Sequence, residues 1–275
     1  MRFERSRHVA ALIGLLLFGR SVVAAETGEI VDRTALKVCA DPNNLPFSNE
    51  QRQGFENKIA ELIGAELGLK VDYAWFPQVI GFVRNTLRAH LCDLVIGTVA
   101  GDEIMQTTNP YYFTTYVMFY KDDKGFTFEG LQDPGLAGLR LGVVAGTPPA
   151  DLLVRHDLMS HAKPYALSVD TRAESSTHQM VQDVVDGAID VGFLWGPIAA
   201  YYRKRDDLPL IMVPLKDEPG AARMEYHIAM GVRANEPEWR RRVNAAIVKR
   251  QTEITAILRD YGVPLLNERG ELARP

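Results

Sequence analysis

The stretch richest in potential chemistry is DLVIGTVAGDEIMQTTNPYY, at residues 93–112. A short apolar run there ends in Gly97 and Thr98, and the carboxylates of Asp102 and Glu103 follow without a basic side chain in the stretch. Two neighbouring carboxylates could form an acid pair for proton transfer. They could also begin a short helix, where acidic side chains oppose the positive end of the helix dipole. We favour this second interpretation.

The sequence shows no recognisable catalytic constellation. It lacks Gly-x-Ser-x-Gly, His-Glu-x-x-His, Cys-x-x-Cys, Gly-x-Gly-x-x-Gly and a Walker phosphate loop. The spacing of His156 and His161 does not put both on one helical face, so they do not suggest a metal pair. Glu103 is the one plausible acid–base residue in the loops. We therefore predict no catalytic residue, no metal site and no cofactor.

The N-terminus has the pattern of an export signal. Basic residues precede an apolar run at 9–18, and Val23-Ala24-Ala25 then supplies small residues for cleavage. That run is too short to span a bilayer, and no later run is long enough. A retained N-terminal anchor is the alternative. We predict cleavage near Ala25 and a periplasmic protein without stable membrane insertion.

The charge balance argues against nucleic acid as a partner. Removing residues 1–25 takes away four arginines and one glutamate, which lowers the net charge from −4 to −7. A chain this acidic has no electrostatic reason to bind nucleic acid or an anionic membrane.

Short apolar runs alternate with helical patterns along the chain, which is typical of βαβ units in the α/β class. We expect strands near 36–40, 71–75, 93–97, 117–120, 139–144, 165–169, 190–194 and 226–232, and helices near 55–67, 83–89, 150–156, 177–186 and 236–261. The pattern restarts after residue 120. We therefore predict two hinged lobes, one formed by residues 26–120 plus 231–275 and the other by 121–230, with the last helix on the first lobe.

A cleft between such lobes is the expected binding site, because ligands lie beyond the carboxyl ends of the strands. Loops at 41–48, 97–102 and 146–149 should line it. Trp75 suits the core and the cleft wall equally, and Tyr111 and Tyr112 also suit a strand entry packed on the core. The predicted ligand- or partner-binding residues are Asp41, Asn43, Asn44, Phe47, Trp75, Gly97, Thr98, Tyr111, Tyr112, Gly146, Thr147 and Trp195.

The two cysteines of the chain, Cys39 and Cys92, raise the question of a disulfide. An oxidising compartment favours pairing. Cys39 lies near the end of one expected strand and Cys92 just before another. If these strands are parallel neighbours, the cysteines lie about four residues apart at ~3.3 Å each, which exceeds the ~7 Å Cα limit for a bridge. We therefore expect two buried thiols.

Several segments together resemble the periplasmic solute-binding proteins that serve amino-acid ABC transporters. These segments are LKVCADPNNLPFS, CDLVIGT, LRLGVVAGT and YHIAMGV. The resemblance implies a two-lobed type 2 periplasmic-binding-protein fold. It also implies an Arg after the acidic pair for the ligand carboxylate, but Ile104 stands there. Trp195 stands where the family has an Asp for the ammonium group. Because an apolar residue cannot replace a bidentate Arg, we expect no zwitterionic amino acid in this cleft.

A denser resemblance runs from Val38 to Tyr120. VCADPNNLPFSN, GFENKIAELI, GFVRNTL, CDLVIGT and TTNPYY resemble the MoxJ/XoxJ proteins of bacterial methanol dehydrogenase operons. This resemblance implies a periplasmic, non-catalytic accessory protein that binds a PQQ-dependent methanol (alcohol) dehydrogenase and helps to mature or activate it. The c-type cytochrome of that system is a second candidate partner. The quinone and the metal would belong to the dehydrogenase.

Two other functions stay open at this point. The chain could be the solute-binding subunit of an ABC transporter for a small non-amino-acid ligand. It could also be an enzyme on a binding-protein fold, in which case Glu103 should point into the cleft.

Overall fold

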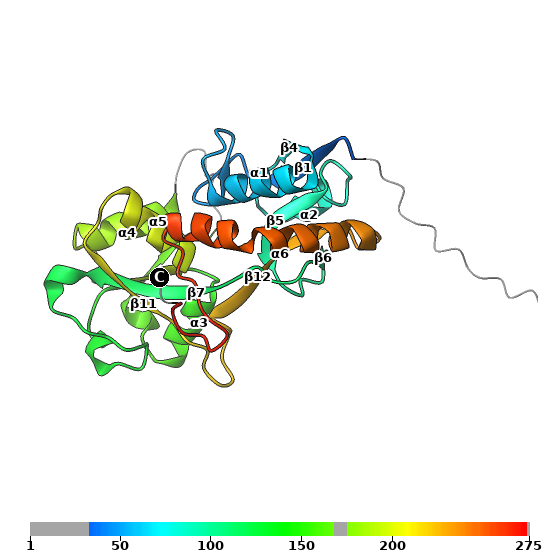
Figure 1. Ribbon diagram of the computed structural model, residues 1–275. Helices are drawn as coiled ribbons and strands as arrows, with labels where there is room; N and C mark the ends of the chain where they lie inside the picture. The colour runs from blue at the N-terminus through cyan, green and yellow to red at the C-terminus, as the bar shows by residue number, and fades with distance from the viewer. Residues whose placement is uncertain (1–32, 168–174, 274–275) are drawn as a thin grey trace, which may run out of the picture.

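The computed structural model describes residues 33–167 and 175–273 (Figure 1). The predicted signal peptide lies outside the described residues. The strand expected at 165–169 is found earlier, at Ala162–Tyr165, and residues 168–169 of the expected range are not described. None of the helices in the described part of the chain is both long and apolar enough to cross a membrane.

Ten strands form one continuous sheet in the order β4-β1-β5-β12-β7-β10-β8-β9, with β6 beside β12 and β11 beside β7. Pairing is parallel at both ends of the sheet, between β1 and its neighbours and between β8 and its neighbours. The ten strands are β1 Ala35–Ala40, β4 Lys70–Trp75, β5 Leu94–Val99, β6 Gln106–Thr107, β7 Tyr112–Lys121, β8 Leu141–Val144, β9 Ala162–Tyr165, β10 Val191–Trp195, β11 Leu210–Pro214 and β12 Glu225–Val232.

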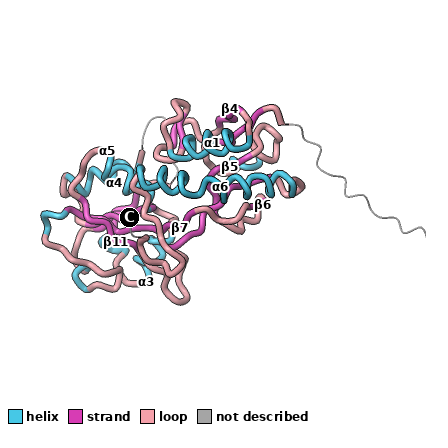
Figure 2. Tube along the Cα trace, in the orientation of Figure 1, coloured by secondary structure: helices cyan, strands magenta, loops and turns pink. Residues whose placement is uncertain are grey.

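The antiparallel strands β7 and β12 connect the two halves of the sheet (Figure 2). Within this pair, Tyr112 opposes Ile228 and Thr115 opposes Glu225. At one end of the molecule β12 pairs with β5, and at the other β7 pairs with β10 and β11. The connection therefore consists of paired strands and not of loose linkers.

Helices cover the faces of the sheet and enclose separate hydrophobic clusters. Strands β1, β5 and β12 pack with α1 and α6 in one cluster, whereas β7, β8 and β10 pack with α3, α4 and α5 in two others. The last helix thus lies against α1 (Figure 1). The helices are α1 Phe55–Leu67, α2 Phe82–Asn85, α3 Pro148–Arg155, α4 Ser176–Val185, α5 Gly196–Arg205 and α6 Pro237–Asp260.

Helix α1 has the predicted bounds. Ile59 and Ile63, one turn apart, are both buried, and Gly68 ends the helix with a φ of 70°, a left-handed conformation that glycine adopts at low cost. At the other end, the side chain of Asn57 accepts a hydrogen bond from the Gly54 N–H at 3.1 Å. The beginning of α1 is therefore fixed in position.

The helix predicted at 83–89 is largely absent, because α2 ends at Asn85. The Thr86 hydroxyl donates to the Phe82 carbonyl at 2.7 Å, and such side-chain bonds compete with the helical pattern. The chain then continues in turns to His90, which has a φ of 57°. The pattern also gave no sign of α5 or β11, and β7 is longer than the strand expected at 117–120.

Cys39 and Cys92 form a disulfide, so the expectation of two free thiols was wrong. Their Cα atoms lie 5.3 Å apart. The strands are parallel neighbours as expected, with Cys39 opposite Val95. The error was to extend the strand straight back to Cys92: the turns before it pack with α2 over the face of the sheet that carries Cys39, and they bring Cys92 there.

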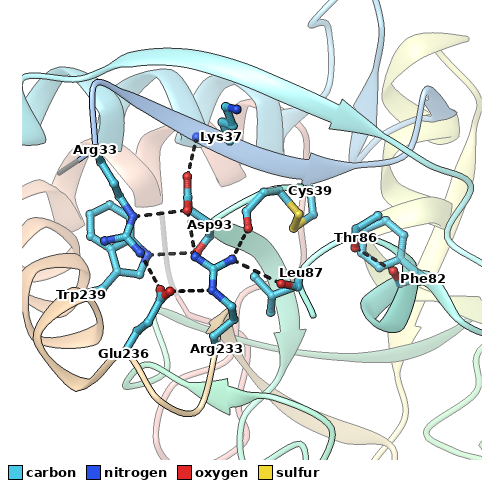
Figure 3. Close-up of a disulfide and its surroundings, with 11 residues drawn as sticks. Arg33, Lys37, Cys39, Phe82, Thr86, Leu87, Asp93, Arg233, Glu236 and Trp239 are labelled. Atoms are coloured by element: carbon cyan, nitrogen blue, oxygen red, sulfur yellow. Dashed lines mark hydrogen bonds and ion pairs between the residues drawn. A yellow bond between two sulfur atoms is a disulfide. The ribbon is translucent and has the colours of Figure 1, made fainter. Parts of the chain in front are cut away.

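A buried ionic network lies beside the disulfide (Figure 3). The Arg233 guanidinium contacts Glu236 at 2.6 Å and Asp93 at 2.9 Å, and it also donates to the Cys92 carbonyl. Arg33 reaches the same two carboxylates, at 2.5 Å and 3.3 Å. The network therefore joins the start of β5 to the chain between β12 and α6.

The C-terminal segment after α6 returns to the connecting strands. The Leu266 N–H donates to the Phe113 carbonyl, and the Thr114 hydroxyl donates to the Pro264 carbonyl, both at 2.8 Å. Pro264 also packs so closely on Gly196 that a Cβ there would overlap it. Figure 1 shows this segment, in red, running from the end of α6 onto β7.

Candidate functional site

A cavity of about 460 Å³ lies where α1, β5, β7, β10 and β12 approach one another. This volume is within the range of small-molecule sites, about 300–1,000 Å³. Its walls come from both halves of the sheet. The lining residues are Phe47, Glu56, Gln78, Gly97, Thr98, Val99, Asp102, Tyr112, Tyr116, Pro148, Trp195, Tyr226 and Ile228.

Aromatic rings form much of the wall. Trp195, Tyr116 and Tyr226 pack edge to face with one another, with ring centroids 4.9 Å to 6.3 Å apart. They come from β10, β7 and β12, so the sheet itself positions them. Phe47 and Tyr112 both pack against the buried ring of Phe55. Both groups of rings, the cluster around Trp195 and the pair Phe47 and Tyr112, therefore line the same cavity.

Glu56, in the first turn of α1, is the most perturbed acid of the cavity. Its burial, reinforced by the negative charge of Asp41, raises the pKa of the Glu56 carboxyl to about 8. A carboxyl at a helix start would normally have a lowered pKa, so burial outweighs the helix dipole here. No described residue donates a hydrogen bond to the Glu56 side chain. At pH 7 this carboxyl is therefore mainly protonated.

Gly97 makes room for Glu56. A Cβ on Gly97 would overlap a Glu56 carboxyl oxygen, so a side chain at this strand position would displace the acid. Thr98 follows and donates to Asp102 at 3.2 Å. The Gly97-Thr98 strand end thus borders the cavity. Gly97 is needed there because it lets the Glu56 carboxyl group lie close to the strand backbone.

The acidic pair does not begin a helix, which corrects the favoured interpretation. Residues 100–105 form a turn, in which the Asp102 carboxylate accepts the N–H of Ile104 at 2.8 Å. Such a local bond stabilises a turn in place of a helix. Asp102 lines the cavity, whereas Glu103 and Ile104 are exposed and lie outside it. The enzyme hypothesis thereby loses Glu103 as its support.

The loop after β1 acts mainly as support for the cavity. Asp41 is buried, and its carboxylate accepts N–H bonds from Asn43 at 2.8 Å and Gln78 at 2.6 Å. Asn44 contacts the side chain of Gln78 at 3.2 Å. Only Phe47 of the four residues predicted in this loop lines the cavity, and Gln78 lines it instead of the asparagines. A two-stranded hairpin, β2 Asn43–Asn44 and β3 Ser48–Asn49, shapes this loop.

Four other predicted residues lie outside the cavity lining. Trp75 stacks on Tyr73 with ring centroids 4.4 Å apart. Tyr111 is buried, and its hydroxyl donates to the Ile96 carbonyl at 2.9 Å. Gly146 is exposed, and Thr147 donates to the Val144 carbonyl just before α3. Of the predicted set, the cavity brings together Phe47, Gly97, Thr98, Tyr112 and Trp195.

Sequence reasoning missed Glu56, Tyr116 and Tyr226. An acid in the first helical turn is usually solvated, so nothing in the local pattern distinguished Glu56. The sequence did carry one signal, a glycine inside a strand, because such a glycine often marks a close approach. Tyr116 and Tyr226 lie at the cavity because β7 is long and pairs with β12 in this register. The sequence pattern revealed neither the length of β7 nor this register.

Within the described part of the chain, no three His, Cys, Asp or Glu side chains are placed to hold a metal ion. The described lining supplies aromatic rings, carboxyl groups, hydroxyl groups and one amide around a space of small-molecule size.

Comparison with known proteins agrees with this architecture. Residues 36–263 match the family of bacterial extracellular solute-binding proteins, family 3. Protein MoxJ of Methylorubrum extorquens is 32% identical over 86% of this chain and 83% of its own length. Protein MoxJ of Paracoccus denitrificans is 29% identical over 90% of this chain and 95% of its own.

Solved structures agree as well. The periplasmic binding protein XoxJ from Methylobacterium extorquens AM1 is 38% identical, with a TM-score of 0.73 over 85% of this chain and all of the other. MxaJ from Methlophaga aminisulfidivorans MPT is 29% identical, with a TM-score of 0.77 over 84% of this chain and all of the other. An ancestral cationic amino acid solute-binding protein, at 21% identity and a TM-score of 0.64, shares the fold. The predicted two-lobed α/β fold is confirmed.

Proposed function

Because this chain belongs to the family 3 bacterial extracellular solute-binding proteins and, within them, to the MoxJ/XoxJ group, we propose that it is a periplasmic, non-catalytic accessory protein of a PQQ-dependent methanol (alcohol) dehydrogenase. It binds the dehydrogenase and helps to mature or activate it. The membership carries this proposal, since the sequence resembles the MoxJ/XoxJ proteins of bacterial methanol dehydrogenase operons. Export through the signal peptide at residues 1–25 is part of the proposal.

The residues that line the cavity argue against an amino acid as its ligand. Trp195 occupies the position of the family's ammonium-binding Asp and lines the cavity, and Ile104 in place of the carboxylate-binding Arg is exposed outside it. No described lining residue is basic. A ligand α-carboxylate would therefore meet the carboxyl group of Asp102 and find no countercharge among the described lining residues, which is unfavourable.

We place the lobes at residues 26–120 plus 231–275 and at residues 121–230. The hydrophobic clusters follow this division except at its borders, where Met118 and Tyr120 of β7 pack in the second lobe and Met230 of β12 packs in the first. In this arrangement the paired strands β7 and β12 form the hinge. The aromatic cleft residues Phe47, Tyr112 and Trp195 would then lie between the lobes, accessible in the open form.

A deletion strain tests the accessory role. We expect the strain to contain normal amounts of dehydrogenase polypeptide but a smaller active fraction, restored by a plasmid copy of this gene. Pull-down of the tagged protein from periplasmic extract should recover the dehydrogenase, and immunoblotting for the c-type cytochrome would identify a ternary complex. Unchanged dehydrogenase activity per polypeptide in the deletion strain would refute the proposal.

A solute-binding role for an ABC transporter is the second candidate, and the cavity of about 460 Å³ is the observation that favours it. The two roles differ in phenotype. Loss of a transport subunit would abolish uptake of one labelled solute and leave the active fraction of the dehydrogenase unchanged.

A further inference from the structure

The cavity combines acidic side chains with an absence of described cations. Glu56 and Asp102 contribute carboxyl groups, and none of the described lining residues is Lys, Arg or His. One basic residue approaches the wall from outside: the guanidinium carbon of Arg223 lies 5.8 Å from the ring centroid of Tyr226. The described lining therefore offers two carboxyl groups, one of which is protonated at pH 7, and no positive charge.

The same space is bordered by five aromatic rings, those of Phe47, Tyr112, Tyr116, Trp195 and Tyr226. Aromatic faces carry negative charge density and attract cations within about 6 Å of the ring centroid, with tryptophan the strongest. The mutual packing of Trp195, Tyr116 and Tyr226 fixes these rings before any ligand arrives. A pre-organised aromatic wall beside a carboxyl group is the usual composition of an organic-cation site.

We propose that this cavity binds a small organic cation, an alkylammonium or quaternary ammonium ion. Its alkyl groups lie against Trp195 and the neighbouring tyrosines, and its charge faces the carboxyl groups of Glu56 and Asp102. This ligand class explains the missing amino-acid anchors, because such a cation has no carboxylate that needs an arginine. The inference does not depend on the dehydrogenase partnership.

The surroundings of Glu56 link binding to pH. Burial and, to a smaller extent, the charge of Asp41 in the loop after β1 raise the pKa of Glu56. The neighbouring titratable side chains are Tyr73 of β4, Tyr111 and Tyr112. None of these groups supplies a positive charge. A cation in the cavity would favour the carboxylate form of Glu56 and release its proton, so binding strengthens as the pH rises towards 8.

Isothermal titration with a charged ligand and its neutral isostere tests the proposal. The probes are choline and 3,3-dimethyl-1-butanol, which have nearly the same shape and differ in charge. We expect saturable choline binding with a Kd below about 1 mM and at least tenfold weaker binding of the alcohol. Equal affinities for the two probes, or no choline binding at pH 8, would overturn the proposal.

Variants then locate the site. Glu56→Gln keeps the shape but removes the ionisable group, and it should weaken choline binding about tenfold and abolish proton release, measured in two buffers of different ionisation enthalpy. Trp195→Leu should weaken binding by about 2- to 30-fold. Glu103→Gln, an exposed acid outside the cavity, is the matched control and should bind as the wild type does. Thermal melts establish that each variant is folded, and wild-type affinity in folded Glu56→Gln would contradict the assignment.

Discussion

At the scale of single residues, the protonated Glu56 has a consequence for stability. Its pKa is about 8 in the folded protein against an ordinary 4.5, so between these values the folded state holds a proton that the unfolded state has lost. Stability therefore declines as the pH rises from about 4.5 to 8 and then levels off.

Glu56→Gln should remove this decline. The variant is expected to match the wild type near pH 4.5 and to exceed its unfolding free energy at pH 9 by up to about 5 kcal/mol, because each pKa unit corresponds to about 1.4 kcal/mol. Denaturant unfolding at several pH values measures it. Parallel pH profiles for the variant and the wild type would show that Glu56 is not the responsible group.

At this scale, the sequence predicted five of the thirteen residues that line the cavity. Phe47, Gly97, Thr98, Tyr112 and Trp195 were predictable because turn residues and strand ends mark a cleft in α/β folds. Glu56 was not, because its role depends on burial by segments far away in the sequence, and local pattern contains no measure of burial.

At the scale of elements, the disulfide fixes the segment before β5 against β1. It closes a loop with a sequence separation of 53 residues. Cross-linking a loop of this length reduces the entropy of the unfolded chain, and the loss of a native bridge of this kind costs about 4 kcal/mol. The double variant Cys39→Ala/Cys92→Ala should therefore unfold at clearly lower denaturant concentration.

The control for this prediction is the reduced wild type, which should show the same loss as the variant. If the wild type under strong reducing conditions kept its full unfolding free energy, the bridge would contribute nothing to stability.

The ionic network around Arg233 also holds elements together, because it joins the start of β5 to the chain between β12 and α6. Arg233→Met leaves Asp93 and Glu236 with less countercharge in a buried setting, and such losses cost about 3–5 kcal/mol. Arg241→Met, on the exposed first part of α6, is the control and should change stability by less than about 1 kcal/mol. Chemical denaturation of both variants measures the difference. Equal effects would mean that Arg33 alone suffices for the two carboxylates.

Elements were predictable where periodicity was long and uninterrupted, as in α1 and α6. They were missed where side chains or tertiary pairing decide the outcome. Thr86 ends α2 by bonding to the Phe82 carbonyl, and β11 is a strand because β7 offers it a partner. The disulfide was mispredicted for a related reason. Strand register could not place Cys92, because Cys92 lies in turns that cross the face of the sheet and not in a strand.

At the scale of the whole molecule, the alternation of strands and helices predicted the two-part architecture. The return of the C-terminal segment to the connecting strands was not predictable, because residues 262–273 have no periodic pattern. This segment holds Leu266, which is 7% exposed, on β7.

Truncation after Val263 should therefore lower the unfolding free energy by about 3 kcal/mol, through loss of the buried Leu266 side chain and of two hydrogen bonds to β7. Arg269→Ala, an exposed position in the same segment, should leave it unchanged. Thermal and denaturant unfolding test this. A truncated protein as stable as the full chain would show that the segment only covers β7.

The position of the two ends has a practical consequence for anyone who attaches this protein to a surface, a dye or a fusion partner. The C-terminal segment rests on the strands that join the two halves, whereas the chain enters β1 at the far end of the molecule (Figure 1). A tether after residue 273 would pull on the strands that we propose as the hinge, so single-molecule and immobilised-binding measurements should carry their handle ahead of Arg33.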